Sequence, residues 1–136
     1  MSAAPDTLTG QCLCGAVRFT LRAPFRPIIV CHCRQCARWT GHAVYATAVA
    51  PDRFTLNSGE ADLAWFRASA KAARGFCQAC GSSLFWKPDC GAHISVLSGT
   101  LDLPTGLEIA EHIFAGDKSD YYGIAGDAPC HAQDHG

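Results

Sequence analysis

The chain has 136 residues, the length of one ordinary domain, and 49% of them are hydrophobic, which argues against disorder. Its formal net charge of −1 gives no electrostatic reason to expect nucleic-acid binding. The N-terminus has no basic segment followed by an apolar one, and no apolar run is as long as a membrane span. We therefore expect a cytoplasmic domain with no signal peptide, no nucleic-acid partner and no membrane partner.

Short apolar segments with a period of two residues dominate the chain. Val17, Phe19 and Leu21 alternate with polar side chains, which predicts a half-buried strand over residues 17–21. Further strands are predicted over residues 28–30, 42–49, 54–56, 63–67, 84–86 and 94–97. Glycine- and proline-containing turns separate them, so the pattern favours an all-β sandwich or a barrel-like fold.

Only two segments, residues 33–39 and 68–73, have the composition of helices, and both are short. The polar residues 132–136 at the end of the chain are expected to be frayed.

Nine cysteines are the most informative feature of the composition. An odd number cannot form a fully paired disulfide framework, and cytoplasmic thiols stay reduced, so ligand spacings favour metal binding. Seven of the nine lie in three short motifs. The other two, Cys90 and Cys130, stand alone, and we expect Cys90 to be a small buried side chain and Cys130 a surface thiol.

Two of the motifs together supply four thiolates. In Cys12-Leu13-Cys14 the two sulfurs fall on one side of an extended chain, and Cys77-Gln78-Ala79-Cys80 is a C-x-x-C pair followed by Gly81. Four thiolates make a closed tetrahedral zinc site of the structural kind. The sequence therefore predicts that Cys12, Cys14, Cys77 and Cys80 hold one zinc ion that joins distant parts of the chain.

The third motif, Cys31-His32-Cys33-Arg34-Gln35-Cys36, has only three cysteines. Three protein ligands with an open fourth position are typical of a catalytic zinc ion. His32, His42, His93 or Cys90 remain alternative fourth ligands. His32 lies between two ligands, so we expect its ring to point away from the metal and to be hydrogen bonded elsewhere.

These motifs resemble the glutathione-dependent formaldehyde-activating enzyme family, which also includes centromere protein V. The resemblance rests on the segments GQCLCG, CHCRQC with Gly41 after it, FCQACGS, SGTLD, and EHIF with Lys118 after it. It extends from about residue 10 to about residue 128. We therefore expect a single zinc-binding domain over residues 10–128, an N-terminal extension over residues 1–9 and a C-terminal tail over residues 129–136.

The resemblance implies a mainly β, β-tent fold of small antiparallel sheets around zinc, with two zinc ions per chain. It assigns Cys12, Cys14, Cys77 and Cys80 to the structural ion and Cys31, Cys33 and Cys36 to the catalytic one. It also implies a carbon–sulfur lyase that forms or cleaves the adduct of glutathione and formaldehyde, with a small-molecule thiol and an aldehyde as partners.

An anionic thiol such as glutathione requires cations at the mouth of the site. Arg34 and Arg38 are the candidates nearest to the ligand motif, with Lys71 and Arg74 further along the chain. Each of them is equally interpretable as an ordinary surface charge. Three functions stay open at this point: the lyase, a zinc-stabilised binding module without activity, and a metal or redox sensor that uses the exposed thiolates. The sequence gives no indication of the oligomeric state.

Overall fold

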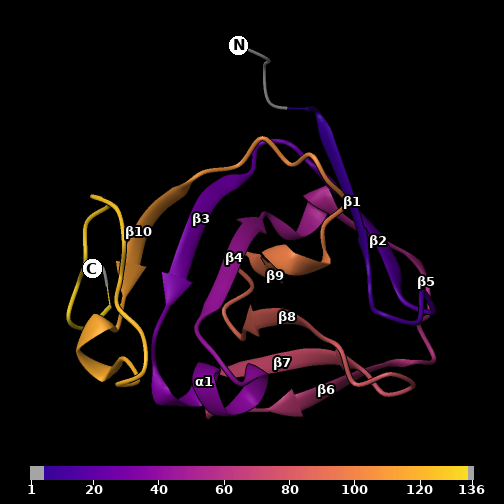
Figure 1. Cartoon of the computed structure of the whole chain (residues 1–136). Helices are drawn as coiled ribbons and strands as arrows, with labels where there is room; N and C mark the ends of the chain where they lie inside the picture. Colours follow the sequence, from indigo (N-terminus) through magenta and orange to yellow (C-terminus); the bar gives the residue numbers. More distant parts are fainter. Residues whose placement is uncertain (1–4, 135–136) are drawn as a thin grey trace.

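A computed structural model, in which residues 5–134 are described, shows two sheets packed around a shared core (Figure 1). The smaller sheet has the strand order β1-β2-β5 and is antiparallel throughout. Its strands are β1 (Thr7–Gln11), β2 (Arg18–Arg22) and β5 (Phe54–Ser58). Residues 1–4 and 135–136, which belong to the expected terminal segments, lie outside the described residues.

The larger sheet has the strand order β10-β3-β4-β9-β8-β7-β6. Neighbouring strands in this sheet are antiparallel, except that β10 and β3 run parallel. The strands are β3 (Arg26–Cys31), β4 (Val44–Val49), β6 (Leu63–Arg67), β7 (Ala72–Cys77), β8 (Ser83–Pro88), β9 (Ile94–Leu97) and β10 (Ile109–Ile113).

The expected mainly β, single-domain fold is confirmed, although the larger sheet is mixed rather than purely antiparallel. The seven strands predicted from alternation correspond to β2, β3, β4, β5, β6, β8 and β9. The helix predicted over residues 68–73 is wrong, because Ala72 and Ala73 begin strand β7. Both alanines are buried between neighbouring strands, so packing outweighs their helix propensity.

The α-helix α1 (Arg34–Thr40) confirms the helix predicted over residues 33–39. Its N-cap is Cys33, whose sulfur accepts the backbone N–H of Cys36 at 3.3 Å. Its C-cap is Gly41, which has a φ of 91° and donates its N–H to the carbonyl of Ala37. This left-handed conformation favours glycine and stops the helix after two turns. Three single-turn 3₁₀ helices complete the secondary structure: Pro51–Arg53, Ser98–Thr100 and Ala115–Asp117.

The core between the two sheets includes a cluster of aromatic rings among aliphatic side chains. The Phe19 ring of the smaller sheet lies 5.1 Å from the Phe85 ring of the larger sheet in an edge-to-face arrangement, and Phe54 contacts both rings. Phe19 and Phe85 are both fully buried. The aromatic contact fixes the smaller sheet against β8 and thereby positions the turn after β1.

The last described residues lie along the open edge of β10. The backbone N–H of His112 donates to the carbonyl of Pro129, and that of Phe114 donates to the carbonyl of Gln133. The expectation that residues 132–136 are frayed is therefore wrong at 132 and 133, because their carbonyls accept backbone hydrogen bonds. Among the residues that the structure describes, no helix has the length and apolarity needed to cross a lipid bilayer.

Candidate metal centres and the adjoining cavity

The four-cysteine cluster joins the two sheets at one end. Cys12 and Cys14 lie in the turn after β1, and Cys77 and Cys80 lie at the end of β7 and in the turn that follows. The four Sγ atoms lie within 4.8 Å of one another. The sequence-predicted set is thus brought together in space by residues from two different sheets.

The spacing of these sulfurs fits a tetrahedral zinc ion. With Zn–S bonds of about 2.3 Å, the sulfurs of a regular tetrahedron are about 3.8 Å apart. Cys12 Sγ lies 3.6 Å from Cys14 Sγ, and Cys14 Sγ lies 3.9 Å from Cys77 Sγ. The backbone N–H of Val17 donates to Cys12 Sγ at 3.3 Å, and the hydroxyl of Ser82 lowers the pKa of Cys80 to about 5. These contacts stabilise the thiolate forms of Cys12 and Cys80, the form in which cysteine binds a metal.

The three-cysteine cluster forms at the junction between β3 and α1. Cys31 is the last residue of β3, Cys33 caps α1, and Cys36 lies in the first turn of the helix. Their Sγ atoms also lie within 4.8 Å of one another. No histidine or carboxylate among residues 5–134 joins this group, so the described part of the chain supplies three ligand atoms to it.

Hydrogen bonds inside this cluster favour a thiolate at Cys33, whereas the pKa values of Cys31 and Cys36 are raised. Thiol hydrogen bonds from Cys31 and then Cys36 lower the pKa of Cys33 to about 2, because a donated hydrogen bond stabilises the ionised sulfur. The guanidinium of Arg74 donates to Cys36 Sγ at 3.7 Å. A cluster that already contains a thiolate is suited to bind a soft divalent metal such as zinc.

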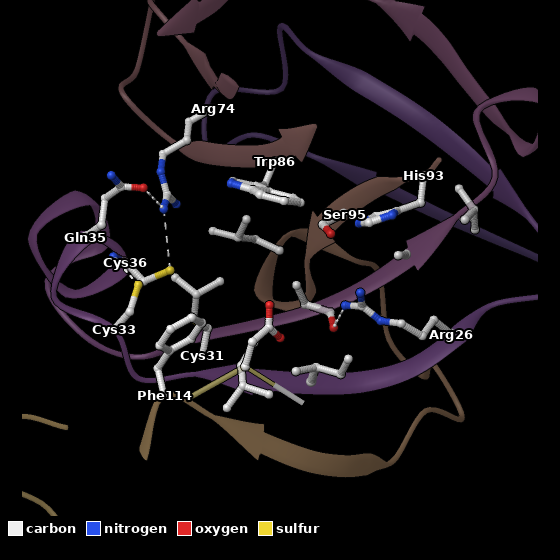
Figure 2. Close-up of a pocket in the computed structure, with 18 of the residues that line it drawn as sticks. Arg26, Cys31, Cys33, Gln35, Cys36, Arg74, Trp86, His93, Ser95 and Phe114 are labelled. Carbon is white, nitrogen blue, oxygen red and sulfur yellow. Dashed lines mark hydrogen bonds between the residues drawn. The ribbon is translucent and has the colours of Figure 1, made fainter. Parts of the chain in front are cut away.

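A cavity of about 880 Å³ opens beside this cluster (Figure 2). All three of its cysteines line the cavity, and the remaining wall is mostly apolar, with side chains such as Val44, Leu97 and Phe114. The volume falls in the range of small-molecule sites. The three sulfurs therefore lie next to a space that can receive a ligand.

Arg26 and His93 lie at the end of the cavity opposite the cysteines (Figure 2). Arg26 donates to the carbonyl of Ala46 at 2.9 Å, while its buried Nε has no hydrogen-bond partner. Burial, followed by the charge of Arg26, lowers the pKa of His93, which keeps its imidazole neutral. Sequence reasoning named His93 only as an alternative metal ligand and did not name Arg26, because no motif marks either residue.

His32 points away from the three sulfurs, as expected. Its Nδ1 is 2.7 Å from the hydroxyl of Tyr122, and its Nε2 is 2.9 Å from Nδ1 of His112 on β10. His32 and His112 are both buried. These contacts connect the peptide between Cys31 and Cys33 to the C-terminal part of the chain.

The cationic side chains that were predicted to contact an anionic substrate occupy different environments. Arg34 and Arg38 lie on α1 with exposed side chains outside the cavity lining, and Arg34 donates to Ser119 Oγ at 2.6 Å. Lys71 is exposed, whereas Arg74 is buried and lines the cavity. His42 is exposed and pairs with the hydroxyl of Tyr121 at 3.0 Å.

The two isolated cysteines lie outside both clusters. Cys130 is exposed, as expected, but the expectation of a buried Cys90 is wrong. Cys90 lies in the turn between β8 and β9, where its side chain faces solvent rather than the core.

Fold and site together define a mainly β protein with two cysteine clusters suited to metal, one of them beside a cavity. The sequence profile of the family described as glutathione-dependent formaldehyde-activating enzyme matches residues 7–117. The chain belongs to this family.

The fold also matches a crystal structure of a Rhodobacter sphaeroides protein, a structural-genomics target, with a TM-score of 0.58 and 21% sequence identity. The match covers 74% of this chain and 97% of that one. At this level of identity the match supports the fold and no more.

Proposed function

We propose that this chain is a zinc-dependent carbon–sulfur lyase that forms or cleaves the adduct of a thiol and an aldehyde. Glutathione or a similar thiol and formaldehyde or a similar aldehyde are the proposed substrates, and the cytoplasm, where thiols stay reduced, is the proposed location. The observation that carries the proposal is that Cys31, Cys33 and Cys36 line the wall of the cavity. A purely structural cluster would have its fourth side closed by the protein.

The proposed reaction is an addition that balances without a further reagent. The thiolate sulfur attacks the carbonyl carbon, a C–S bond forms, and the π pair of the C=O bond moves to oxygen, which then takes a proton. Cleavage is the reverse of these steps. A zinc ion held by three cysteines supplies positive charge that favours the thiolate form of a fourth, substrate thiol.

The residues of the cavity then have separate roles. Cys31, Cys33 and Cys36 hold one end of the site, and apolar side chains such as Val44 and Leu97 exclude water from it. At about 880 Å³ the cavity has room for a ligand larger than formaldehyde alone. We propose that Arg34 and Arg38, on the outer surface of α1, contact anionic groups of the thiol that extend beyond the cavity.

The direct test follows exchange between glutathione, formaldehyde and their adduct by NMR at equilibrium. We expect the zinc-loaded protein to accelerate this exchange and Cys31→Ser to abolish the acceleration. Cys90→Ser is the matched control, because Cys90 is exposed and lies outside both clusters. This control should behave as the wild type.

Failure of the test would favour the other functions considered for this chain. If neither formaldehyde nor larger aldehydes exchange faster with the protein present, the enzyme proposal is wrong and a binding module is favoured. If peroxide instead releases one zinc ion reversibly at low concentration, a redox sensor is favoured.

A further inference from the structure

Arg74 on β7 is a buried charge with an unusual set of neighbours. Only 4% of its surface is exposed, and neither of the ion pairs found among residues 5–134 includes it. Its Nε is buried without a hydrogen-bond partner. Arginine is rarely buried without a negative partner, because removing its charge from water is costly. Neither of these ion pairs supplies the negative charge that a buried Arg74 requires nearby.

The contacts of the guanidinium identify that partner as the cysteine cluster. One nitrogen, Nη2, donates to Gln35 Oε1 at 2.7 Å and to Cys36 Sγ at 3.7 Å. The guanidinium carbon also lies 4.7 Å from the centre of the Trp39 ring. Figure 2 shows Arg74 directed toward Cys36, with Gln35 beside it. Two residues of α1 thus hold the guanidinium against a metal-binding sulfur.

The positive charge of Arg74 changes the net charge of a metal centre at the three cysteines. Three thiolates and one divalent ion carry a net charge of −1, and adding a fourth thiolate would bring it to −2 beside largely apolar walls. A second uncompensated charge in such surroundings is strongly disfavoured. With the +1 charge of Arg74 included, the centre is neutral before the thiolate binds and carries −1 afterwards.

We propose that Arg74 is a positioning residue that makes the three-cysteine centre accept an anionic fourth ligand, a substrate thiolate. The inference rests on the proposed function in one respect, namely that a thiol takes the fourth position. Two other charged side chains line the cavity, Arg26 and Asp134. Arg26 lies at the opposite end from the cysteines, so it cannot replace Arg74 beside Cys36 (Figure 2).

The test uses the full chain loaded with cobalt, whose visible spectrum reports a bound thiolate. Metal affinity is measured first, and the cobalt protein is then titrated with glutathione and with 2-mercaptoethanol at constant pH. We expect Arg74→Gln to weaken thiol binding on the order of a hundredfold, as expected for losing a unit charge a few ångströms away. Cobalt affinity should change by less than about tenfold, because the guanidinium attracts the incoming anion and not the cation.

Arg74→Lys is the conservative variant, and it should keep thiol binding within about tenfold of the wild type because the positive charge remains. Arg67→Gln is the matched control, since Arg67 lies on the adjacent strand β6, is exposed and pairs with Asp89. Its thiol binding should be unchanged. The lysine variant also keeps the test decisive if Arg74→Gln fails to fold, because thiol binding lost in a folded Arg74→Lys overturns the inference.

The other outcomes separate the inference from the proposed function. Equal loss of cobalt and thiol affinity in Arg74→Gln would indicate a purely structural role, and unchanged thiol affinity would indicate no role, so either result overturns the inference. Arg74-dependent thiol binding without faster thiol–aldehyde exchange would support the inference and refute the proposed function. A wild-type cobalt protein that binds no thiol would refute both.

Discussion

The residue Gly59, which follows β5, shows how tightly the backbone turns are packed against the smaller sheet. Its φ is 87°, a conformation that side chains other than glycine rarely adopt. A Cβ at this position would contact the carbonyl oxygen of Ala16 and lie 2.7 Å from Cα of Val17. Both contacts are with backbone, which cannot move aside without disturbing the segment that leads from Cys14 into β2.

We therefore expect Gly59→Ala to lower the free energy of unfolding by about 2 kcal/mol or more, through backbone strain and overpacking together. Urea unfolding followed by tryptophan fluorescence measures this change. Gly99→Ala is the control, because no atom lies within 4 Å of its added Cβ and its φ is not in the left-handed range. Equal stabilities for the two variants would contradict the prediction.

His93 gives the cavity a predictable dependence on pH. Burial and the charge of Arg26 lower its pKa in the folded state, so the unfolded state binds a proton more readily. The contribution of His93 to stability is therefore complete above its unfolded pKa of about 6.5 and is lost as the pH falls toward the folded value. Urea midpoints measured across this range should fall less steeply for His93→Gln than for the wild type. An identical slope would show that His93 does not contribute.

At the same scale, spacing alone predicts which cysteines lie together, because a C-x-C or C-x-x-C pair constrains its own geometry. The burial of Arg74 and its contact with Cys36 could not be predicted in this way. That contact joins a strand to a helix nearly forty residues earlier in the chain, and no local pattern encodes such a pairing.

Among the elements, β7 shows most clearly why local patterns fail. Residues 68–73 contain four alanines and a lysine, which favour a helix in isolation. In the fold, Ala72 and Ala73 are small enough to lie between β6 and β8, and Gly75 leaves room for the rings of Trp65 and Phe85. The alternation of apolar and polar residues did not predict strands β1 and β10. It did predict the half-buried β2, because one face of that strand contacts the core.

The segment after residue 128 acts as an added element, because it covers the open edge of β10. We expect a chain that ends at Ala128 to lose protection from hydrogen exchange at the amides of His112 and Phe114, whose acceptors are the carbonyls of Pro129 and Gln133. Exchange of these amides should become at least tenfold faster, since each loses its hydrogen bond. The control is a chain that ends at Asp134, and protection that survives the longer deletion would contradict the prediction.

For the whole molecule, the four-cysteine cluster has a different position from the three-cysteine cluster. It joins the turn after β1 to the turn after β7, and therefore connects the smaller sheet to the larger one. A metal bound there closes a loop of more than sixty residues, so its binding free energy contributes directly to folding. The three-cysteine cluster lies within one short stretch of chain and closes no comparable loop.

We expect Cys14→Ser to reduce the zinc content from two ions to one and to lower the free energy of unfolding by several kcal/mol, as is typical for a lost structural metal. Cys31→Ser should also remove one ion but affect stability much less. Elemental analysis and chemical denaturation of the two variants make the comparison. A larger loss of stability in Cys31→Ser would show that the roles of the two clusters have been reversed.

The N-cap of α1 affects how the three-cysteine cluster would bind a metal ion. The sulfur of Cys33 accepts the N–H of Cys36 from within the protein, so the start of the helix is held by a contact that requires no metal. The Cys33 sulfur is therefore held against the first turn of α1 without a metal. We infer that such a preorganised site exchanges its ion with the surroundings without local refolding, so that metal supply governs its occupancy, whereas the closed four-cysteine site is filled once, as the chain folds.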